Sequence, residues 1–264
     1  MPTKPVGPIE QKISDMICVT GKEHTAAQLE TRLTQTQEAP NSDAWINEVR
    51  LDHLDNPLEG LPVVRRWATH MRMLVCCRPR RQQGGFGGSE QQRCALLEEA
   101  LQCGAWAVDV EWQTDAALRN RLLAKAGGAR SVLSHHLFTS QWNERTLAAA
   151  LRDMAALEAD TLKLAVFVDD TCGISILRKA AQSVFAPFGP FGAKNRVLIP
   201  MGPAGVIGRV CYKKMGSAWT YLAAAETGRT AAGQLTLAQA SQLGLTDPTT
   251  AGEMPLFALF GGPQ

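Results

Sequence analysis

The segment Thr161-Leu-Lys-Leu-Ala-Val-Phe-Val168 places a single lysine in a continuous apolar run. Read as a β-strand, its side chains alternate between two faces, so that Lys163, Ala165 and Phe167 share one face and aliphatic residues share the other. Because burial disfavours the charged form of an amine, the lysine needs either a partner or a function at this position.

Two interpretations of Lys163 are open. In the first, burial lowers the pKa of the amine from about 10.4 towards neutrality and gives a nucleophile that forms a Schiff base with a carbonyl carbon. In the second, Lys163 lies near a strand end, after the polar Ala159-Asp-Thr161, and its ammonium group reaches solvent. The spacing alone favours the second interpretation.

Short apolar runs alternate with longer amphipathic segments along the chain, which is typical of repeated βα units. Eight strands are predicted, at 16–20, 45–52, 73–78, 106–112, 131–136, 162–168, 196–201 and 218–223. Helices are predicted between them, including 25–36, 90–102, 115–126, 144–159 and 174–185. This pattern predicts an α/β fold, the (β/α)8 TIM barrel. A doubly wound sheet is the alternative, but no Gly-x-Gly-x-x-Gly follows the first strand.

The barrel is expected to span residues 13–245. Residues 1–12 are polar and contain several prolines, and we expect a loosely ordered lead-in there. Residues 246–264 begin with a linker composition and end in the apolar Met254-Pro-Leu-Phe-Ala-Leu-Phe-Gly-Gly262. This tail either packs on the barrel or begins a truncated second domain.

Composition narrows the class of protein. With 264 residues and 45% apolar content, the chain is long enough for one large domain. A net charge of +2 predicts neither a nucleic acid nor a membrane surface as partner. The 7 cysteines are an odd number with no Cys-x-x-Cys pair, which indicates reduced thiols in a cytoplasmic protein. No apolar run is long enough to span a membrane, and no secretion leader is visible.

Several charged residues are predicted to point into the barrel. Glu48, Arg50 and Asp52 share one face of the second strand, and a structural ion-pair network and a substrate site are equally compatible with that pattern. The others are Arg78 at the end of the third strand and Asp109 and Glu111 on one face of the fourth, and each of them is a candidate for a salt bridge at the end of the barrel.

Consecutive histidines close the fifth strand. Because neighbours alternate between faces, only one of His135 and His136 can point into the barrel, where we expect it to transfer protons. The remaining histidines, His24, His53 and His70, show no His-x-x-x-His spacing, so no metal site is expected.

A glycine-rich turn, Pro200-Met-Gly-Pro-Ala-Gly-Val-Ile-Gly-Arg209, follows the seventh strand, at a position where such barrels often bind anions. Arg209 is a candidate carboxylate clamp.

Over about residues 14–240 these motifs resemble the type I 3-dehydroquinate dehydratases of the shikimate pathway. The residues that carry the resemblance are Glu48-Val-Arg50-Leu-Asp52, Cys77-Arg78 with Gly84-Gly85, Ser134-His135-His136-Leu137-Phe138, Lys163, Met201-Gly202-Pro-Ala-Gly205 with Arg209, Gly216-Ser217 and Gly233-Gln234. Their order and spacing make the resemblance specific. It implies a hydro-lyase that is commonly a homodimer, acts on 3-dehydroquinate and uses no metal or cofactor.

The resemblance also implies roles for individual residues. Lys163 becomes the Schiff-base lysine and His136 the general acid and base. Substrate contacts are implied for Glu48, Arg50, Arg78, Arg209, Thr230 and Gln234, with a further hydroxyl contact from Thr20.

Two departures from the family pattern are visible. Gln83 stands where the family usually has an acidic residue, and the loop before it looks one residue longer, so the partner that orients His136 is open between Gln83, Glu111 and a backbone carbonyl. The loop Thr230-Ala-Ala-Gly-Gln234 replaces the usual Ser-Ala-Pro-Gly-Gln, which predicts a more mobile lid.

Alternative functions are a Schiff-base barrel of the class I aldolase type and a noncatalytic sensor of a shikimate metabolite. The apolar tail from residue 255 on resembles the opening strand of a shikimate dehydrogenase, which predicts a fused partner domain.

Overall fold

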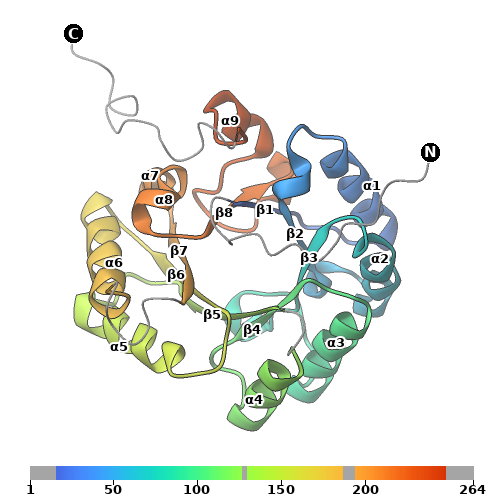
Figure 1. Ribbon diagram of the computed structural model, residues 1–264, viewed down its shortest axis with the longest axis horizontal. Coiled ribbons are helices and arrows are strands. Elements are labelled where there is room, and N and C mark those ends of the chain that lie inside the picture. The colour runs from blue at the N-terminus through green and yellow to red at the C-terminus, as the bar shows by residue number, and fades with distance from the viewer. Residues whose placement is uncertain (1–15, 127–129, 187–193, 248–264) are drawn as a thin grey trace.

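The computed structural model describes residues 16–126, 130–186 and 194–247. Within these residues eight parallel strands form one sheet that curves into a barrel, and helices surround it (Figure 1). The strands are β1 Met16–Thr20, β2 Ile46–Arg50, β3 Arg72–Cys76, β4 Ala107–Glu111, β5 Arg130–Leu137, β6 Thr161–Phe167, β7 Asn195–Met201 and β8 Trp219–Ala223. The predicted (β/α)8 barrel is confirmed.

Helices follow the strands around the outside of the barrel. They are α1 Ala26–Gln37, α2 Gly60–Trp67, α3 Glu90–Gln102, α4 Ala116–Lys125, α5 Glu144–Ala155, α6 Thr171–Val184, α7 Val206–Val210, α8 Tyr212–Met215 and α9 Leu237–Gln242. Four of them, α1, α3, α5 and α9, begin at a capping box, in which the side chains of the first and fourth residues satisfy each other's backbone N–H groups. None of the described helices is both long and apolar enough to cross a membrane.

Some predicted boundaries were wrong for local reasons. The second strand ends at Arg50 instead of residue 52, because the chain turns into a 3-10 helix at Leu51–His53. Helix α6 begins at Thr171, three residues before its predicted start, because Asp170 caps it by accepting a hydrogen bond from the Gly173 N–H.

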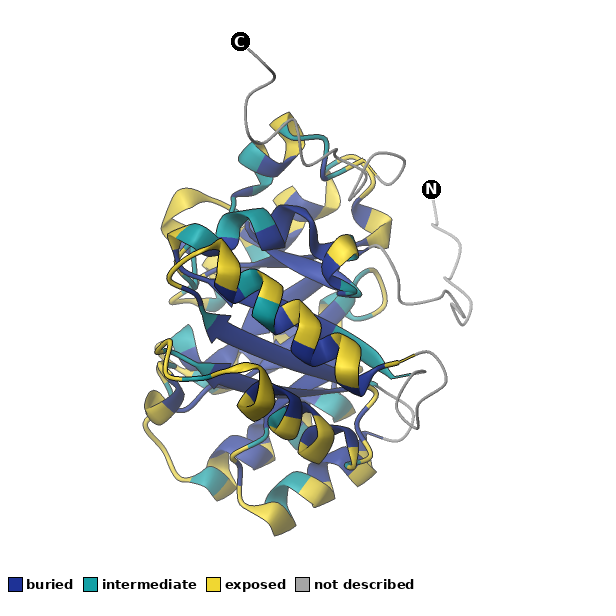
Figure 2. Cartoon of the chain, turned by 90° about the vertical axis from the view of Figure 1, so that its left-hand side faces the viewer, coloured by how far each residue is buried: buried dark blue, intermediate teal, exposed yellow. Residues whose placement is uncertain are grey.

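The two faces of each strand serve different parts of the molecule. On β6 the side chains of Leu162, Leu164 and Val166 are fully buried between the sheet and the helices. The intervening Lys163 and Ala165 point inward, as the strand parity predicted, and Figure 2 shows the strands buried beneath the helices. Lys163 therefore lies on the inner wall of the barrel, and not at a strand end in solvent.

The barrel has a seam between β7 and β8. The order of paired strands begins at β7 and ends at β8, while β8 pairs with β1 over five residues. A backbone hydrogen bond from the Ala218 N–H to the Arg196 carbonyl bridges the seam. Ser217 Oγ bridges it as well, since it accepts from the Leu198 N–H at 2.6 Å and donates to the Leu198 carbonyl at 3.4 Å. Pro200 has no backbone N–H to donate to a neighbouring strand. It is tolerated in β7 because β7 lies at the edge of the sheet, where this donor is not needed.

The predicted lead-in, residues 1–12, lies outside the described residues, as does the predicted linker and apolar tail, 246–264, from residue 248 on. Both stay predictions, together with the boundaries at residues 13 and 245.

We expect the substitution Leu164→Ala to lower the free energy of unfolding by about 2–5 kcal/mol, because it opens a cavity between the sheet and the helices. Urea unfolding measures this value. The control is Leu58→Ala, since Leu58 is 56% exposed, and it should change stability by less than about 0.5 kcal/mol. Equal effects of the two substitutions would contradict the layered core.

Candidate active site

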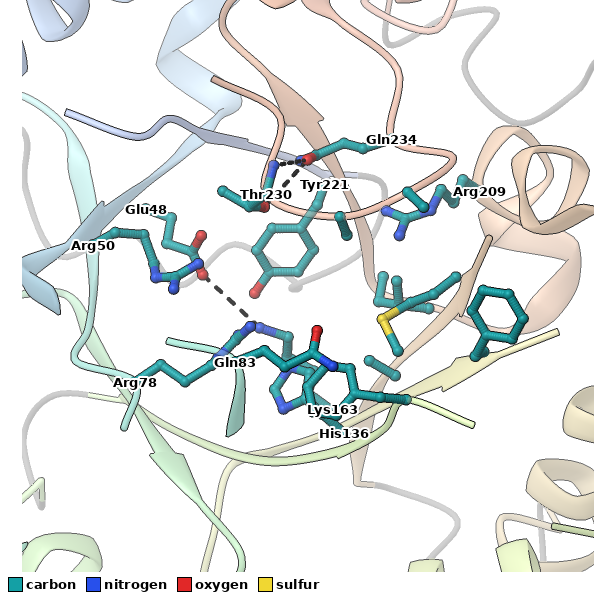
Figure 3. A pocket seen from close by; sticks show the side chains of 17 residues that line it. Glu48, Arg50, Arg78, Gln83, His136, Lys163, Arg209, Tyr221, Thr230 and Gln234 are labelled. Carbon is teal, nitrogen blue, oxygen red and sulfur yellow. Dashed lines mark hydrogen bonds and ion pairs between the residues drawn. The ribbon is translucent and has the colours of Figure 1, made fainter. Parts of the chain in front are cut away.

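A pocket of about 290 Å³ opens at the carboxyl ends of the strands, where barrels of this type place their sites (Figure 3). Its polar lining consists of Glu48, Arg50, Arg78, Gln83, His136, Lys163, Arg209, Tyr221, Thr230 and Gln234. The structure thus brings together all of the predicted site residues except Thr20. Thr20 instead lies behind Glu48 and donates a hydrogen bond to its carboxylate at 2.6 Å.

Lys163 is an ion-paired residue inside the barrel. Its Nζ donates to Asp109 Oδ2 at 2.9 Å and lies 3.9 Å from Glu48 Oε1. The Tyr221 ring covers a further side, with its centroid 4.4 Å from Nζ. Burial alone would lower the pKa of Lys163, but Asp109 and Glu48 raise it above the ordinary value of the amine. The prediction of a lowered pKa was wrong because the sequence showed the burial without the two carboxylates.

Arg50 and Asp52 form a bidentate pair. Arg50 Nε donates to Asp52 Oδ1 at 2.9 Å, and Arg50 Nη2 donates to Asp52 Oδ2 at 2.7 Å. Burial alone would raise the pKa of Asp52, but Arg50 and backbone N–H donors lower it to about 2. The Gly85 N–H is one of these donors, and a Cβ at Gly85 would lie 2.1 Å from the Asp52 carbonyl oxygen. Asp52 therefore has the structural role, since its ion pair with Arg50 orients the arginine towards the pocket, and only Arg50 lines the pocket.

His136 is the histidine that faces the pocket. Its Nδ1 lies 3.2 Å from Glu111 Oε2, and Glu111 Oε1 accepts from Arg78 Nε at 3.1 Å. A carboxylate can only accept, so Nδ1 carries the hydrogen and Nε2 keeps its lone pair. Burial and the nearby Arg78 lower the pKa of His136 to about 4. The ring is therefore neutral at pH 7. His135 points the other way and lies edge-on to Trp112, with the ring centroids 4.9 Å apart.

Of the candidates for the partner of His136, the structure shows Glu111 and not Gln83 in contact with the ring. Gln83 lies in a left-handed turn with φ of 57° and lines the pocket. Burial would raise the pKa of Glu111, but His136 and Arg78 hold it well below its usual range. An acidic partner is thus kept although the residue before the paired glycines is neutral.

The end of the pocket opposite Glu48, Arg50 and Arg78 offers hydrogen-bond donors. Arg209 is 3% exposed, and its Nε donates to the Pro200 carbonyl at 3.0 Å. Gln234 Oε1 accepts from the backbone N–H of Thr230 at 2.8 Å and from its hydroxyl at 3.2 Å. Within the described parts of the chain, Arg209 Nη2 and Gln234 Nε2 have no hydrogen-bond partner. Burial lowers the pKa of Arg209 to about 10, so the guanidinium is charged at pH 7 and suits an anion.

Two residues of this site were not connected with Lys163 from the sequence. Tyr221 lies on the inner face of β8, and Asp109 lies beneath the pocket on β4. Strand parity predicted that Asp109 points into the barrel and would have given the same direction for Tyr221, but no parity argument connects either residue with Lys163 on β6.

Among the described residues, Glu48, Cys76 and Asp109 bring three potential metal ligands within 4.8 Å of one another. The Lys163 ammonium already contacts Asp109 there, so the cation that this cluster holds is the lysine.

Comparison with known proteins gives the family. The family model for type I 3-dehydroquinases matches residues 17–244. The chain belongs to this family. The protein is therefore a hydro-lyase, as its motifs predicted.

Curated relatives agree with this assignment, and solved structures share the fold. A 3-dehydroquinate dehydratase of Dehalococcoides mccartyi is 30% identical over 213 residues, covering 79% of this chain and 89% of the relative. One from Desulfotalea psychrophila is 33% identical over 202 residues, covering 74% and 84%. A type I 3-dehydroquinate dehydratase structure from Clostridium difficile has the same fold, with a TM-score of 0.77 and 22% identity over 90% of this chain and 92% of that one.

The dehydroquinate dehydratase and shikimate dehydrogenase structure from S. pombe shares the fold with a TM-score of 0.70 and 19% identity. The match covers 87% of this chain and 44% of that one. The predicted fusion concerns residues outside the described part of the chain and stays a prediction.

The charges around His136 should shift its pKa in opposite directions. Arg78→Gln should raise the pKa from about 4, because a nearby positive charge is lost, and Glu111→Gln should keep the ring neutral to still lower pH. The ring proton resonances of His136, followed by NMR against pH, measure both changes. Gln83→Ala is the control and should leave the pKa unchanged. An unchanged pKa in both charge variants would show that burial alone sets it.

Proposed function

We propose that this type I 3-dehydroquinase eliminates water from 3-dehydroquinate to give 3-dehydroshikimate, with Lys163 as the Schiff-base lysine and His136 as the general acid and base. The observation that carries the proposal is the placement of these two residues on neighbouring strands. Lys163 is the register partner of Ser134 and Ala165 that of His136, so that both side chains enter the same pocket from adjacent positions.

The reaction begins at the Lys163 nitrogen. After the ammonium loses a proton, Nζ attacks the C3 carbonyl carbon, and the carbonyl oxygen leaves as water. The resulting iminium draws electrons from C2, which acidifies the C2 proton. His136 is neutral at pH 7 and has a free lone pair on Nε2, so it is suited to remove that proton.

The same histidine then completes the elimination. The enamine electrons form the C1–C2 double bond as the C1 hydroxyl departs, and protonated His136 supplies the proton with which this hydroxyl leaves as water. Hydrolysis of the iminium returns Lys163 and releases 3-dehydroshikimate. Glu111 stabilises the imidazolium between the two proton transfers, since its carboxylate accepts from Nδ1.

The two ends of the pocket suit the two ends of the substrate. The free donors of Arg209 and Gln234 are suited to the substrate carboxylate. Glu48, Arg50 and Arg78 line the opposite end, where we propose that they bind ring hydroxyls. Thr230 acts indirectly, because it fixes the Gln234 side chain. Thr20 likewise acts through Glu48, in place of the direct substrate contact expected from the sequence.

Neither alternative function has an observation in its favour. A class I aldolase would also need a Schiff-base lysine such as Lys163, but the family model that matches is that of the dehydratases. A noncatalytic sensor would not require His136 to be held by Glu111 with its second nitrogen free.

Borohydride added together with 3-dehydroquinate should trap a covalent adduct on Lys163, because reduction converts the iminium into a stable secondary amine. Peptide mapping by mass spectrometry locates the label. Lys163→Ala should give no adduct, whereas Lys125→Ala, which removes an exposed amine, should label like the wild type. An adduct on Lys179, Lys194 or Lys213 would overturn the assignment.

Arg209→Met should lower kcat/KM for 3-dehydroquinate by about 30-fold or more, because the substrate carboxylate loses a buried, charged hydrogen-bond donor. Steady-state kinetics measure the change, followed at the absorbance of the conjugated enone product. Arg66→Met, at an arginine whose side chain is 65% exposed, is the control. An unchanged kcat/KM in Arg209→Met would place the carboxylate elsewhere in the pocket.

A further inference from the structure

We propose that Asp109 is the counter-ion of the Schiff base and that, with Glu48 and the Tyr221 ring, it keeps the imine protonated. This inference rests on the proposed function of Lys163. Asp109 does not line the pocket, and no step of the mechanism above uses it.

Three groups surround the Lys163 nitrogen. Asp109 Oδ2 lies at 2.9 Å, Glu48 Oε1 at 3.9 Å and the centroid of the Tyr221 ring at 4.4 Å. A carboxylate and the face of an aromatic ring both attract a cation. The arrangement therefore favours a positive charge at this nitrogen, whichever bonds the nitrogen makes.

Asp109 is held in one position. Its side chain is buried, and its second oxygen, Oδ1, accepts from the Ser134 hydroxyl. Among the described residues, the Lys163 ammonium is the cation that forms a salt bridge with this carboxylate. A buried carboxylate that loses its partner pays a large desolvation cost, so the charge on Asp109 opposes any state in which the lysine nitrogen is neutral.

The chemistry of the Schiff base makes this effect useful. The ammonium carries three hydrogens and the iminium carries one; two leave with the carbonyl oxygen as water, and the positive charge stays on nitrogen. The remaining N–H needs an acceptor, and Asp109 Oδ2 already accepts from this nitrogen. A neutral imine withdraws electrons from C2 only weakly. Asp109 would thus preserve the electron sink, at the cost of a less available free amine in the first step.

Other ionisable groups also face Lys163 and must be considered. They are Cys18 on β1, Glu48 on β2, Cys76 on β3 and Arg78 after it, Glu111 on β4, His136 on β5, Tyr221 on β8 and Arg209 on α7. Glu111 is already paired with Arg78 and His136, and burial raises the pKa of the Cys18 and Cys76 thiols well above their usual value. Asp109 and Glu48 are therefore the carboxylates that act on the nitrogen.

The test compares Asp109→Asn with the wild type. The amide has nearly the size of the carboxylate but no charge, so the imine should lose its proton at a pH about 1–3 units lower. The imine is formed with 3-dehydroquinate, and its protonation is followed against pH by the ¹⁵N resonance of labelled Lys163. The basic limb of the kcat profile should move by the same amount, while borohydride trapping at neutral pH should persist.

Matched variants separate charge from packing. Cys76→Ala changes the packing beside Asp109, its register partner, without removing a charge, and it should leave the midpoint in place. Asp109→Glu should keep the midpoint above that of Asp109→Asn. If Asp109→Asn does not fold, Glu48→Gln should lower the midpoint in the same direction, by less, because Glu48 lies farther from Nζ.

The outcomes distinguish this inference from the function on which it rests. A wild-type protein that forms no trapped adduct would end the proposed role of Lys163. A trapped adduct together with an imine midpoint that is equal in wild type and Asp109→Asn would overturn only the role of Asp109. Loss of trapping in a folded Asp109→Asn variant would overturn it too, since Asp109 would then be needed to form the imine.

Discussion

The salt bridge between Lys163 and Asp109 is the interaction on which the interior of this barrel depends. Both side chains are almost fully buried, and removing one partner of such a pair costs about 3–5 kcal/mol. The other inward charges follow the same requirement, since Arg50 is paired with Asp52 and Glu111 with both Arg78 and His136. The pairing keeps a polar pocket stable inside an apolar wall, and it fixes the directions in which the side chains can act.

Strand parity carried most of what the sequence could predict. It placed Lys163 and Glu48 on the inner face, and it allowed only one of the two consecutive histidines to point inward. The alternation of apolar runs with amphipathic segments gave the number of strands. These conclusions need only local information, because alternation along a strand is a property of neighbouring residues. The family motifs then identified which of the inward residues belong to the site.

The remaining features depend on contacts between distant strands. The pKa of Lys163 depends on Asp109, 54 positions earlier in the chain, and the orientation of His136 depends on Glu111, 25 positions earlier. No periodicity in the sequence reports these distances, so burial alone predicted the wrong direction for the lysine pKa. The contact of Asp52 with the Gly85 N–H, from a loop after the next strand, was likewise not visible in the sequence.

The seam between β7 and β8 has a consequence for solubility as well as for binding. An unpaired strand edge is a hazard in most sheets, because another chain can add a strand to it. Here the Pro200 carbonyl on that edge holds Arg209, and the Gly202 N–H just after β7 binds the Ala232 carbonyl of the loop that follows β8. The contacts that position Arg209 and the loop before Gln234 thus also cover the edge of the sheet. Protection of this edge and the carboxylate binding that we propose for Arg209 therefore depend on the same few atoms.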